Sequence, residues 1–145
     1  MKVFRLCLSL VLILSGSLAL AQSSGEKLGD CLVRKTTGQD RIDLVRWIVL
    51  AYSKHPDVSN FVQTDATAEE NVHQNMGLLF TELVAERCKL EARTAFQSGN
   101  AAFEQAFTTL GQVAAEELMR SKEVNSTIAD FVKYADQKKI EAALE

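Results

Sequence analysis

Two cysteines are the residues whose chemistry the sequence indicates most directly. Cys31 and Cys88 remain once Cys7, which lies in an apolar leader, is set aside. Two cysteines allow one intramolecular pairing, and disulfides persist in exported proteins. The pair lacks the Cys-x-x-Cys spacing that lowers a thiol pKa in redox centres. We therefore expect a structural Cys31–Cys88 disulfide rather than a redox pair.

A Glu-x-x-His sequence, from Glu70 to His73, has the spacing with which helical side chains bind metal in di-iron bundles. Such bundles need a second motif of this kind, and the chain has none. His55, the only other histidine, precedes Pro56 in a predicted turn. A zinc site using both histidines and a carboxylate is a weaker alternative than a solvated His73 paired with Glu69 or Glu70. We therefore expect no metal and no cofactor.

Motifs for catalysis are missing as well. The sequence contains no Gly-x-Ser-x-Gly, no phosphate loop and no glycine-rich dinucleotide turn. Asn125-Ser126-Thr127 matches the glycosylation acceptor pattern, but as a sequence it is equally a helix cap. We expect a protein that is not an enzyme.

Two charged residues interrupt the apolar stripes of predicted helices. Arg87 lies near the middle of one stripe, and Glu117 lies near the middle of the next. An unpaired buried charge is too costly to keep, so each needs a partner, a path to water or a bend in its helix. A plain hairpin register puts Arg87 opposite Leu110, so we do not expect the two charges to pair. They mark either the ends of core layers or a polar pocket beside the disulfide.

Trp47 and Leu50 lie opposite the main apolar stripe of their predicted helix, and this second apolar face needs cover. One interpretation is that residues 28–33 fold over it. The other is that both side chains stay exposed and form a protein-binding patch with His55 and Asp57 of the following turn, because tryptophan is a favoured interface anchor. Both interpretations stay open on the sequence alone.

The elements that position these residues are predicted to be helices. Thr37 and Asp40 form a capping box that begins a helix, and His55-Pro56 ends it. Its main stripe is predicted to consist of Ile42, Val45, Ile48, Val49 and Tyr52. The polar residues 22–29 before it are expected to be disordered up to Cys31.

A long helix over 67–96 is predicted to be central, with Thr67 and Glu70 as its capping box. Gly99 is suited to stop this helix, and a helix over 101–120 should pair with it as a hairpin. Gly77 and Gly111 lie inside these helices, where close helix crossing would explain them. Asn125 is predicted to cap a last helix.

The first 21 residues read as a signal peptide rather than as part of the fold. Lys2 and Arg5 form a basic start, an apolar run follows, and Ala19-Leu20-Ala21 matches a cleavage site. Serines and a glycine interrupt the apolar run, which is shorter than the roughly 20 residues of a membrane span. We expect no stable membrane insertion after cleavage and a periplasmic or secreted protein.

The mature chain, 22–145, should be a single helical domain. Removing 21 of the 145 residues leaves 124, and losing Lys2 and Arg5 changes the net charge from −3 to −5. A mildly acidic chain without a basic tract argues against nucleic acid as a partner. The predicted fold class is all-α: a small, disulfide-stapled bundle of about four to five helices, one of them long and central.

Several short sequences resemble a family of small secreted proteobacterial helical proteins with no assigned activity. They are Cys31-Leu32-Val33-Arg34, Thr36-Thr37, Asp40-Arg41, Leu44-Val45-Arg46-Trp47-Ile48, His55-Pro56-Asp57 and Leu110-Gly111-Gln112-Val113-Ala114-Ala115. The resemblance implies a bacterial periplasmic setting, in which glycosylation at Asn125 is not expected. It implies nothing about mechanism.

Three functional hypotheses follow. The first is a non-enzymatic periplasmic protein that binds another periplasmic protein, of the inhibitor or immunity type. The second is a small-ligand binder with a pocket between helices, for which Arg87 and Glu117 are the only hint. The third, ranked last, is a metal-dependent hydrolase that uses His73.

Overall fold

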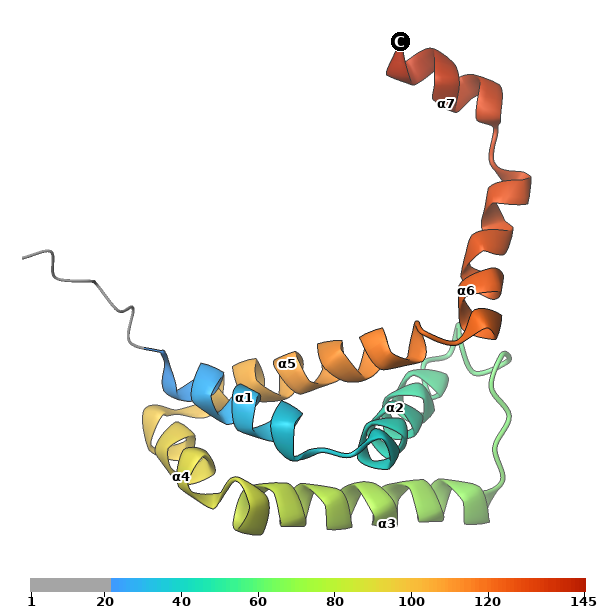
Figure 1. The fold of residues 1–145 in the computed structure, drawn as a ribbon. Helices are drawn as coiled ribbons and strands as arrows, with labels where there is room; N and C mark the ends of the chain where they lie inside the picture. Colours follow the sequence, from blue (N-terminus) through green and yellow to red (C-terminus); the bar gives the residue numbers. More distant parts are fainter. Residues whose placement is uncertain (1–21) are drawn as a thin grey trace, which may run out of the picture.

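The structure, a computed structural model, describes residues 22–145, so the predicted leader over 1–21 lies outside it. Every regular element in the described range is helical, and one disulfide joins Cys31 to Cys88 (Figure 1). The predicted all-α, disulfide-containing class is therefore confirmed. Residues 22–145 form seven α-helices and two short segments of other helix types, more than the four to five helices expected.

Helix α1, Ser24–Lys35, occupies a segment that was expected to be partly disordered. Ser23 and Glu26 form a capping box: the Ser23 hydroxyl accepts from the Glu26 amide at 3.1 Å, and the Glu26 carboxylate accepts from the Ser23 amide at 2.7 Å. Leu28 and Leu32 lie on one face and are fully buried. The prediction of disorder over 22–29 is wrong because this cap and these two leucines fix the helix from its first turn.

Helix α2, Gly38–Ser53, begins and ends where the sequence predicts. The Thr37 hydroxyl accepts from the Asp40 amide at 3.2 Å, and the Asp40 carboxylate accepts from the Thr37 amide at 2.9 Å. The helix stops before His55-Pro56. Its buried apolar residues are Leu44 and Leu50. Of the predicted stripe, Val45 and Ile48 pack against the core, whereas Ile42, Val49 and Tyr52 are exposed.

The single long helix predicted over 67–96 is broken. It consists of α3 (Ala66–Glu82), a π-helical segment η1 (Leu83–Arg87) and α4 (Lys89–Ser98), and its N-cap is Asp65 rather than Thr67. The Cys88 amide donates to the Leu83 carbonyl at 2.9 Å, which is the wider π-type turn. In Figure 1, α4 turns away from α3 at this point. The break brings Cys88 against α1.

Helix α5, Asn100–Leu118, follows Gly99, whose φ of 103° is the positive value that glycine adopts without strain. It packs along α1 at two glycines. A Cβ on Gly25 would lie 2.8 Å from the Ala102 carbonyl oxygen, and one on Gly29 would lie 3.3 Å from Thr109 Cβ. The close helix crossing is therefore between α1 and α5, at Gly25 and Gly29.

The prediction that helices cross closely at Gly77 and Gly111 is wrong. A Cβ added to either glycine would meet no other atom within 4 Å.

The buried core lies where α1, η1, α4 and α5 meet. Its largest fully buried side chains are Leu28, Leu32, Leu83, Leu110 and Cys88. Helix α2 crosses between α3 and α5 beside this core and packs on both (Figure 1). Among residues 22–145, no helix has the length and hydropathy that a membrane span requires.

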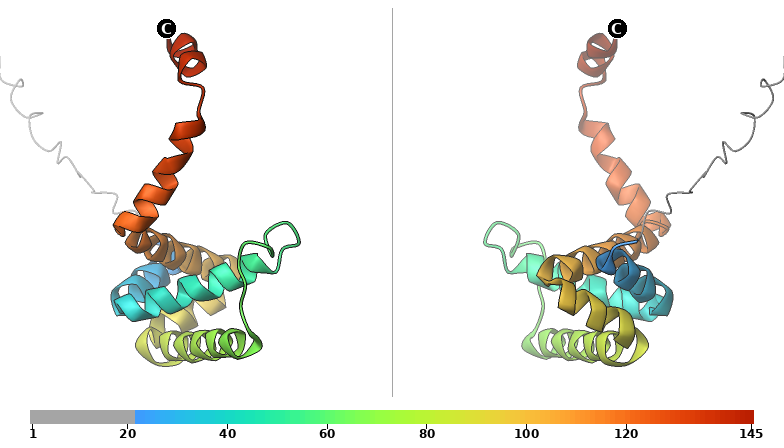
Figure 2. Two further views of the ribbon diagram at one scale, coloured as in Figure 1. Left: turned by 90° about the vertical axis from the view of Figure 1, so that its right-hand side faces the viewer. Right: turned by 90° about the vertical axis from the view of Figure 1, so that its left-hand side faces the viewer.

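A C-terminal arm stands away from the rest of the molecule. It consists of α6 (Lys122–Ala129), the 3-10 segment η2 (Asp130–Tyr134) and α7 (Gln137–Leu144), and none of these contains a buried residue. Both views of Figure 2 show the arm projecting from the body. Ser121 caps α6, whereas the predicted cap, Asn125, lies inside the helix.

Candidate functional site

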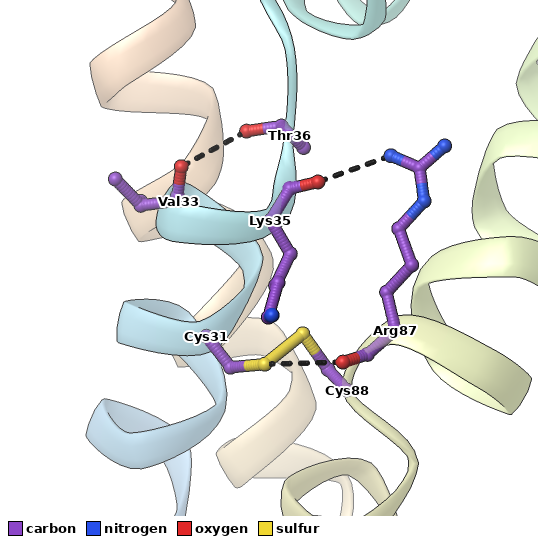
Figure 3. The surroundings of a disulfide bond; sticks show 6 residues. All are labelled: Cys31, Val33, Lys35, Thr36, Arg87 and Cys88. Atoms are coloured by element: carbon purple, nitrogen blue, oxygen red, sulfur yellow. Dashed lines mark hydrogen bonds between the residues drawn. A yellow bond between two sulfur atoms is a disulfide. The ribbon is translucent and has the colours of Figure 1, made fainter.

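The disulfide is a structural element of the core. Cys31 and Cys88 are 4% and 0% exposed, and their Cα atoms lie 5.9 Å apart. Cys31 Sγ lies 3.8 Å from the Arg87 carbonyl oxygen (Figure 3), a contact rather than a hydrogen bond because a disulfide sulfur carries no proton. The predicted pairing is confirmed, and it ties α1 to the start of α4.

Arg87 is the last residue of η1, beside the disulfide, and its guanidinium has three hydrogen-bond acceptors. Its guanidinium donates to the Asp40 carboxylate at 2.7 Å, to the Lys35 carbonyl at 3.0 Å (Figure 3) and to the Glu82 carboxylate. The hydrogen bond to Asp40, followed by that to Glu82, raises the pKa of Arg87. Arg87 thus stays charged and holds the end of α1 against η1.

Glu117 has a different partner. Its carboxylate accepts from Arg41 at 2.6 Å, and Arg41 also donates to Thr36 Oγ1 at 3.2 Å and to the Val33 carbonyl at 3.1 Å. Arg87 and Glu117 therefore do not share a polar pocket. Each is neutralised by a residue in the first turns of α2, Asp40 or Arg41, and the two ion pairs fix the corner between α1 and α2.

The same corner changes the pKa of the Asp40 carboxyl. Burial raises its pKa, but the hydrogen bond from the Thr37 amide and those from the Arg87 and Thr37 side chains outweigh burial, so the pKa is lowered overall. Asp40 is consequently ionised in the folded protein at neutral pH.

An apolar cleft on one side of α2 is the feature best suited to binding. It has a volume of about 520 Å³ and lies between α2, α3 and α5. We call it the α2–α3–α5 cleft. Its lining residues are Leu44, Trp47, Ile48, His73, Met76, Gly77, Phe80, Phe107 and Gly111.

The cleft is open because of its glycines and shaped by its aromatic side chains. Gly77 of α3 and Gly111 of α5 both line it, and the space that a Cβ on either would enter is empty. Phe80 and Phe107 stack at its wall with ring centroids 5.4 Å apart. Trp47 and Phe80 remain 36% and 43% exposed. An apolar concavity with exposed aromatic rings is typical of an interaction site.

The four residues proposed as a binding surface separate in the structure. Trp47 lines the α2–α3–α5 cleft, whereas Leu50 is only 3% exposed and lies on the other side of α2. His55 and Asp57 belong to the connection after α2, which stands out from the body in Figure 2, with side chains 62% and 91% exposed. Cover by residues 28–33 is not what is observed, because α1 packs on α5, α4 and η1.

His73 is exposed on α3, as expected of a solvated helix residue, and it also lines the α2–α3–α5 cleft. Glu69 lies one turn before it, and hydrogen bonds from Lys54 and then Thr64 lower the pKa of the Glu69 carboxyl. Within residues 22–145, no group of three or more histidine, cysteine or acidic side chains is placed to hold a metal ion.

Sequence reasoning missed the cleft itself. The available signal is the pair of helix-interior glycines, Gly77 and Gly111, but a glycine inside a helix predicts close packing, and the structure shows open space at both. The chain matches no protein-family model, no curated protein and no solved structure.

Proposed function

We propose that this protein acts without catalysis, by binding an amphipathic helix of another periplasmic protein in the α2–α3–α5 cleft. Binding of this kind suits an inhibitor or immunity protein, whose role requires a complementary surface and no reacting group. A helix-in-groove complex buries the apolar face of the guest helix in such a concavity.

One observation carries the proposal: the exposed aromatic wall of the cleft. Trp47 and Phe80 keep more than a third of their surface accessible although they stand in an apolar concavity. Tryptophan is enriched among the residues that dominate binding energy when an interface buries it. Covering these rings is therefore favourable for a partner, and leaving them in water is costly.

An oxidising compartment supports the periplasmic part of the proposal. The Cys31–Cys88 disulfide is buried in the core, and disulfides of this kind persist outside the reducing cytoplasm. The leader-like residues 1–21 are consistent with export.

A second candidate function uses the same cleft for a small apolar ligand. Its volume of about 520 Å³ lies within the range of roughly 300–1,000 Å³ that small-molecule sites occupy. His73 is the ionisable side chain in its lining and would orient one polar end of such a ligand. Native mass spectrometry of the purified protein distinguishes this candidate, because a retained small molecule adds its mass to the folded chain.

The main proposal is tested by capture from periplasmic extract with the immobilised wild-type protein and two variants. We expect the wild-type protein to retain a specific protein that Trp47→Ala does not retain, since this substitution removes the anchor but no core residue. Leu78→Ala is the matched control, because Leu78 is 66% exposed on α3 and does not line the cleft. Equal capture by Trp47→Ala and the wild type would rule out the cleft as the binding site.

A further inference from the structure

A second apolar groove, separate from the α2–α3–α5 cleft, lies beside α2. It has a volume of about 390 Å³, within the range of roughly 300–1,000 Å³ that small-molecule sites occupy. It shares no lining residue with the α2–α3–α5 cleft. We call it the aliphatic groove. Its lining residues come from α2, the connection after α2, α3 and the end of α5, and they are Ile42, Val45, Arg46, Val49, Leu50, Val62, Thr64, Ala68, Glu69, Val72 and Leu118.

The apolar walls of this groove contain no aromatic ring. Eight of its eleven lining residues are aliphatic and none is aromatic, whereas Trp47, Phe80 and Phe107 line the α2–α3–α5 cleft. Ile42 and Val49 of the groove remain 38% and 44% exposed. Aliphatic walls give a planar ring nothing to stack on, but they make many dispersion contacts with a flexible methylene chain.

The polar side chains of the groove differ in how far they are already engaged. The Glu69 carboxylate accepts from Lys54 and from the Thr64 hydroxyl, so Glu69 and Thr64 satisfy each other. Arg46 donates from Nη1 to the Asp43 carboxylate at 3.2 Å. Within residues 22–145, its Nε and Nη2 have no acceptor, and its side chain is 61% exposed. The groove therefore offers free donors on one cationic side chain.

We propose that the aliphatic groove binds a free single-chain amphiphile with an anionic end, namely a fatty carboxylate. The methylene chain lies in the groove between α2 and α3, and the carboxylate accepts from Nε and Nη2 of Arg46. A guanidinium binds a carboxylate through two parallel hydrogen bonds of this kind. The groove is separate from the α2–α3–α5 cleft, so this inference goes beyond the proposed function and does not depend on it.

The first test is isothermal titration calorimetry of the purified, oxidised protein. The ligands are octanoate, decanoate, decanol and decyltrimethylammonium, each below its micelle concentration. We expect each added methylene to tighten binding of the acid by up to about fourfold. Decanol and the cationic analogue should bind at least about tenfold more weakly than decanoate, because neither accepts from a guanidinium as a carboxylate does. Equal binding of the three ten-carbon ligands, or no binding of decanoate, overturns the proposal.

Arg46→Gln tests how the carboxylate is recognised. We expect this variant to bind decanoate at least about tenfold more weakly and decanol as the wild type does, because Arg46 meets only the anionic end. Arg93→Gln is the matched control, since Arg93 is exposed on α4 and lines neither concavity. Wild-type affinity of Arg46→Gln for decanoate contradicts the proposal.

Val49→Asp tests the chain-binding wall. A carboxylate at this exposed position repels the acid and should abolish decanoate binding. Leu78→Asp is its control, because Leu78 is 66% exposed on α3 and lines neither concavity. Retained binding by Val49→Asp, or an equal loss in Leu78→Asp, overturns the proposal.

Trp47 fluorescence distinguishes the two concavities. Trp47 is the only tryptophan of the chain and lines the α2–α3–α5 cleft, so we expect its emission to stay unchanged as the aliphatic groove fills. An emission shift with decanoate that persists in Arg46→Gln and Val49→Asp would place the ligand in the cleft and overturn the proposal. Sedimentation with phosphatidylglycerol vesicles without binding of free decanoate would assign the groove to a membrane surface and overturn it as well.

Discussion

At the scale of single residues, Asp40 and Arg41 determine how the first two helices meet the rest of the chain. Asp40 binds Arg87 of η1, and Arg41 binds Glu117 of α5, so adjacent residues in one helix connect to two other elements. Both arginines also donate to carbonyls near the C-terminal end of α1. Arg87 and Glu117, the two charges that interrupt the apolar stripes, therefore form ion pairs that connect helices.

The Asp40 carboxyl should make the stability of the protein depend on pH in acid. Its pKa is lowered in the folded state from an ordinary value of 3.8, so its contribution is fully present above that value and is lost as the pH falls through the folded pKa. We expect Asp40→Asn to lower the free energy of unfolding by about 1–2 kcal/mol at neutral pH and to flatten its fall below about pH 4. Urea unfolding across a pH series measures both effects.

Asp57→Asn is the control for this experiment, because the Asp57 side chain is 91% exposed. Its effect at neutral pH should stay within about 0.5 kcal/mol, as for most surface substitutions. If Asp40→Asn is no more destabilising than this control, the corner formed by Asp40 and Arg87 does not have the role described.

At the scale of helices, the sequence predicts ends better than it predicts faces or breaks. Thr37, His55-Pro56 and Gly99 mark boundaries through local chemistry, and the structure confirms them. The π-type turn before Cys88 is not predictable in this way, because it interrupts a segment whose apolar residues keep continuous helical periodicity. The start of α1 is predictable from the capping box of Ser23 and Glu26, but the polar composition of residues 22–29 favours a prediction of disorder.

Two pairs of helix glycines should respond in opposite ways to substitution by alanine. Gly77→Ala is expected to stabilise the protein by about 0.5–1 kcal/mol, since its Cβ meets open space and alanine favours helix. Gly25→Ala is expected to destabilise it by about 1–3 kcal/mol, because the Cβ would lie 2.8 Å from the Ala102 carbonyl oxygen and force α1 from α5. Chemical denaturation of the two variants gives both values. A stabilising Gly25→Ala would mean that the two helices are not in close contact.

At the scale of the whole molecule, the Cys31–Cys88 link and the packing of α1 on α5 and α4 form the centre of the bundle, and the candidate site lies beside it, where α2 packs on α3 and α5. The disulfide joins positions 57 residues apart and connects α1 to α4 within the core. The fold class and this link were predictable from composition, spacing and cysteine count. The α2–α3–α5 cleft was not, because whether a helix glycine marks contact or open space depends on how the helices cross.

Removing the disulfide should weaken the fold as a whole. The double variant Cys31→Ser with Cys88→Ser leaves no free thiol, and we expect it to lose about 2–5 kcal/mol, the typical cost for a small secreted domain. Thermal and urea unfolding measure the loss. Unfolding of the wild type in reductant is the control, since it breaks the same bond without a substitution. A double variant as stable as the oxidised wild type would show that the bond adds nothing to the core.

The central claim is that the α2–α3–α5 cleft binds a partner protein, and site-specific photo-crosslinking in living cells tests it most directly. A photoreactive residue in place of Phe80 lies at the cleft wall, and the same residue in place of Phe61 lies outside it. We predict a discrete crosslinked protein from position 80 alone, and its loss when Gly77→Leu fills the cleft, since a Cβ at that position meets no neighbouring atom within 4 Å and Gly77 lines the cleft. An equal crosslink from position 61, or an undiminished one in the Gly77→Leu protein, would contradict the account.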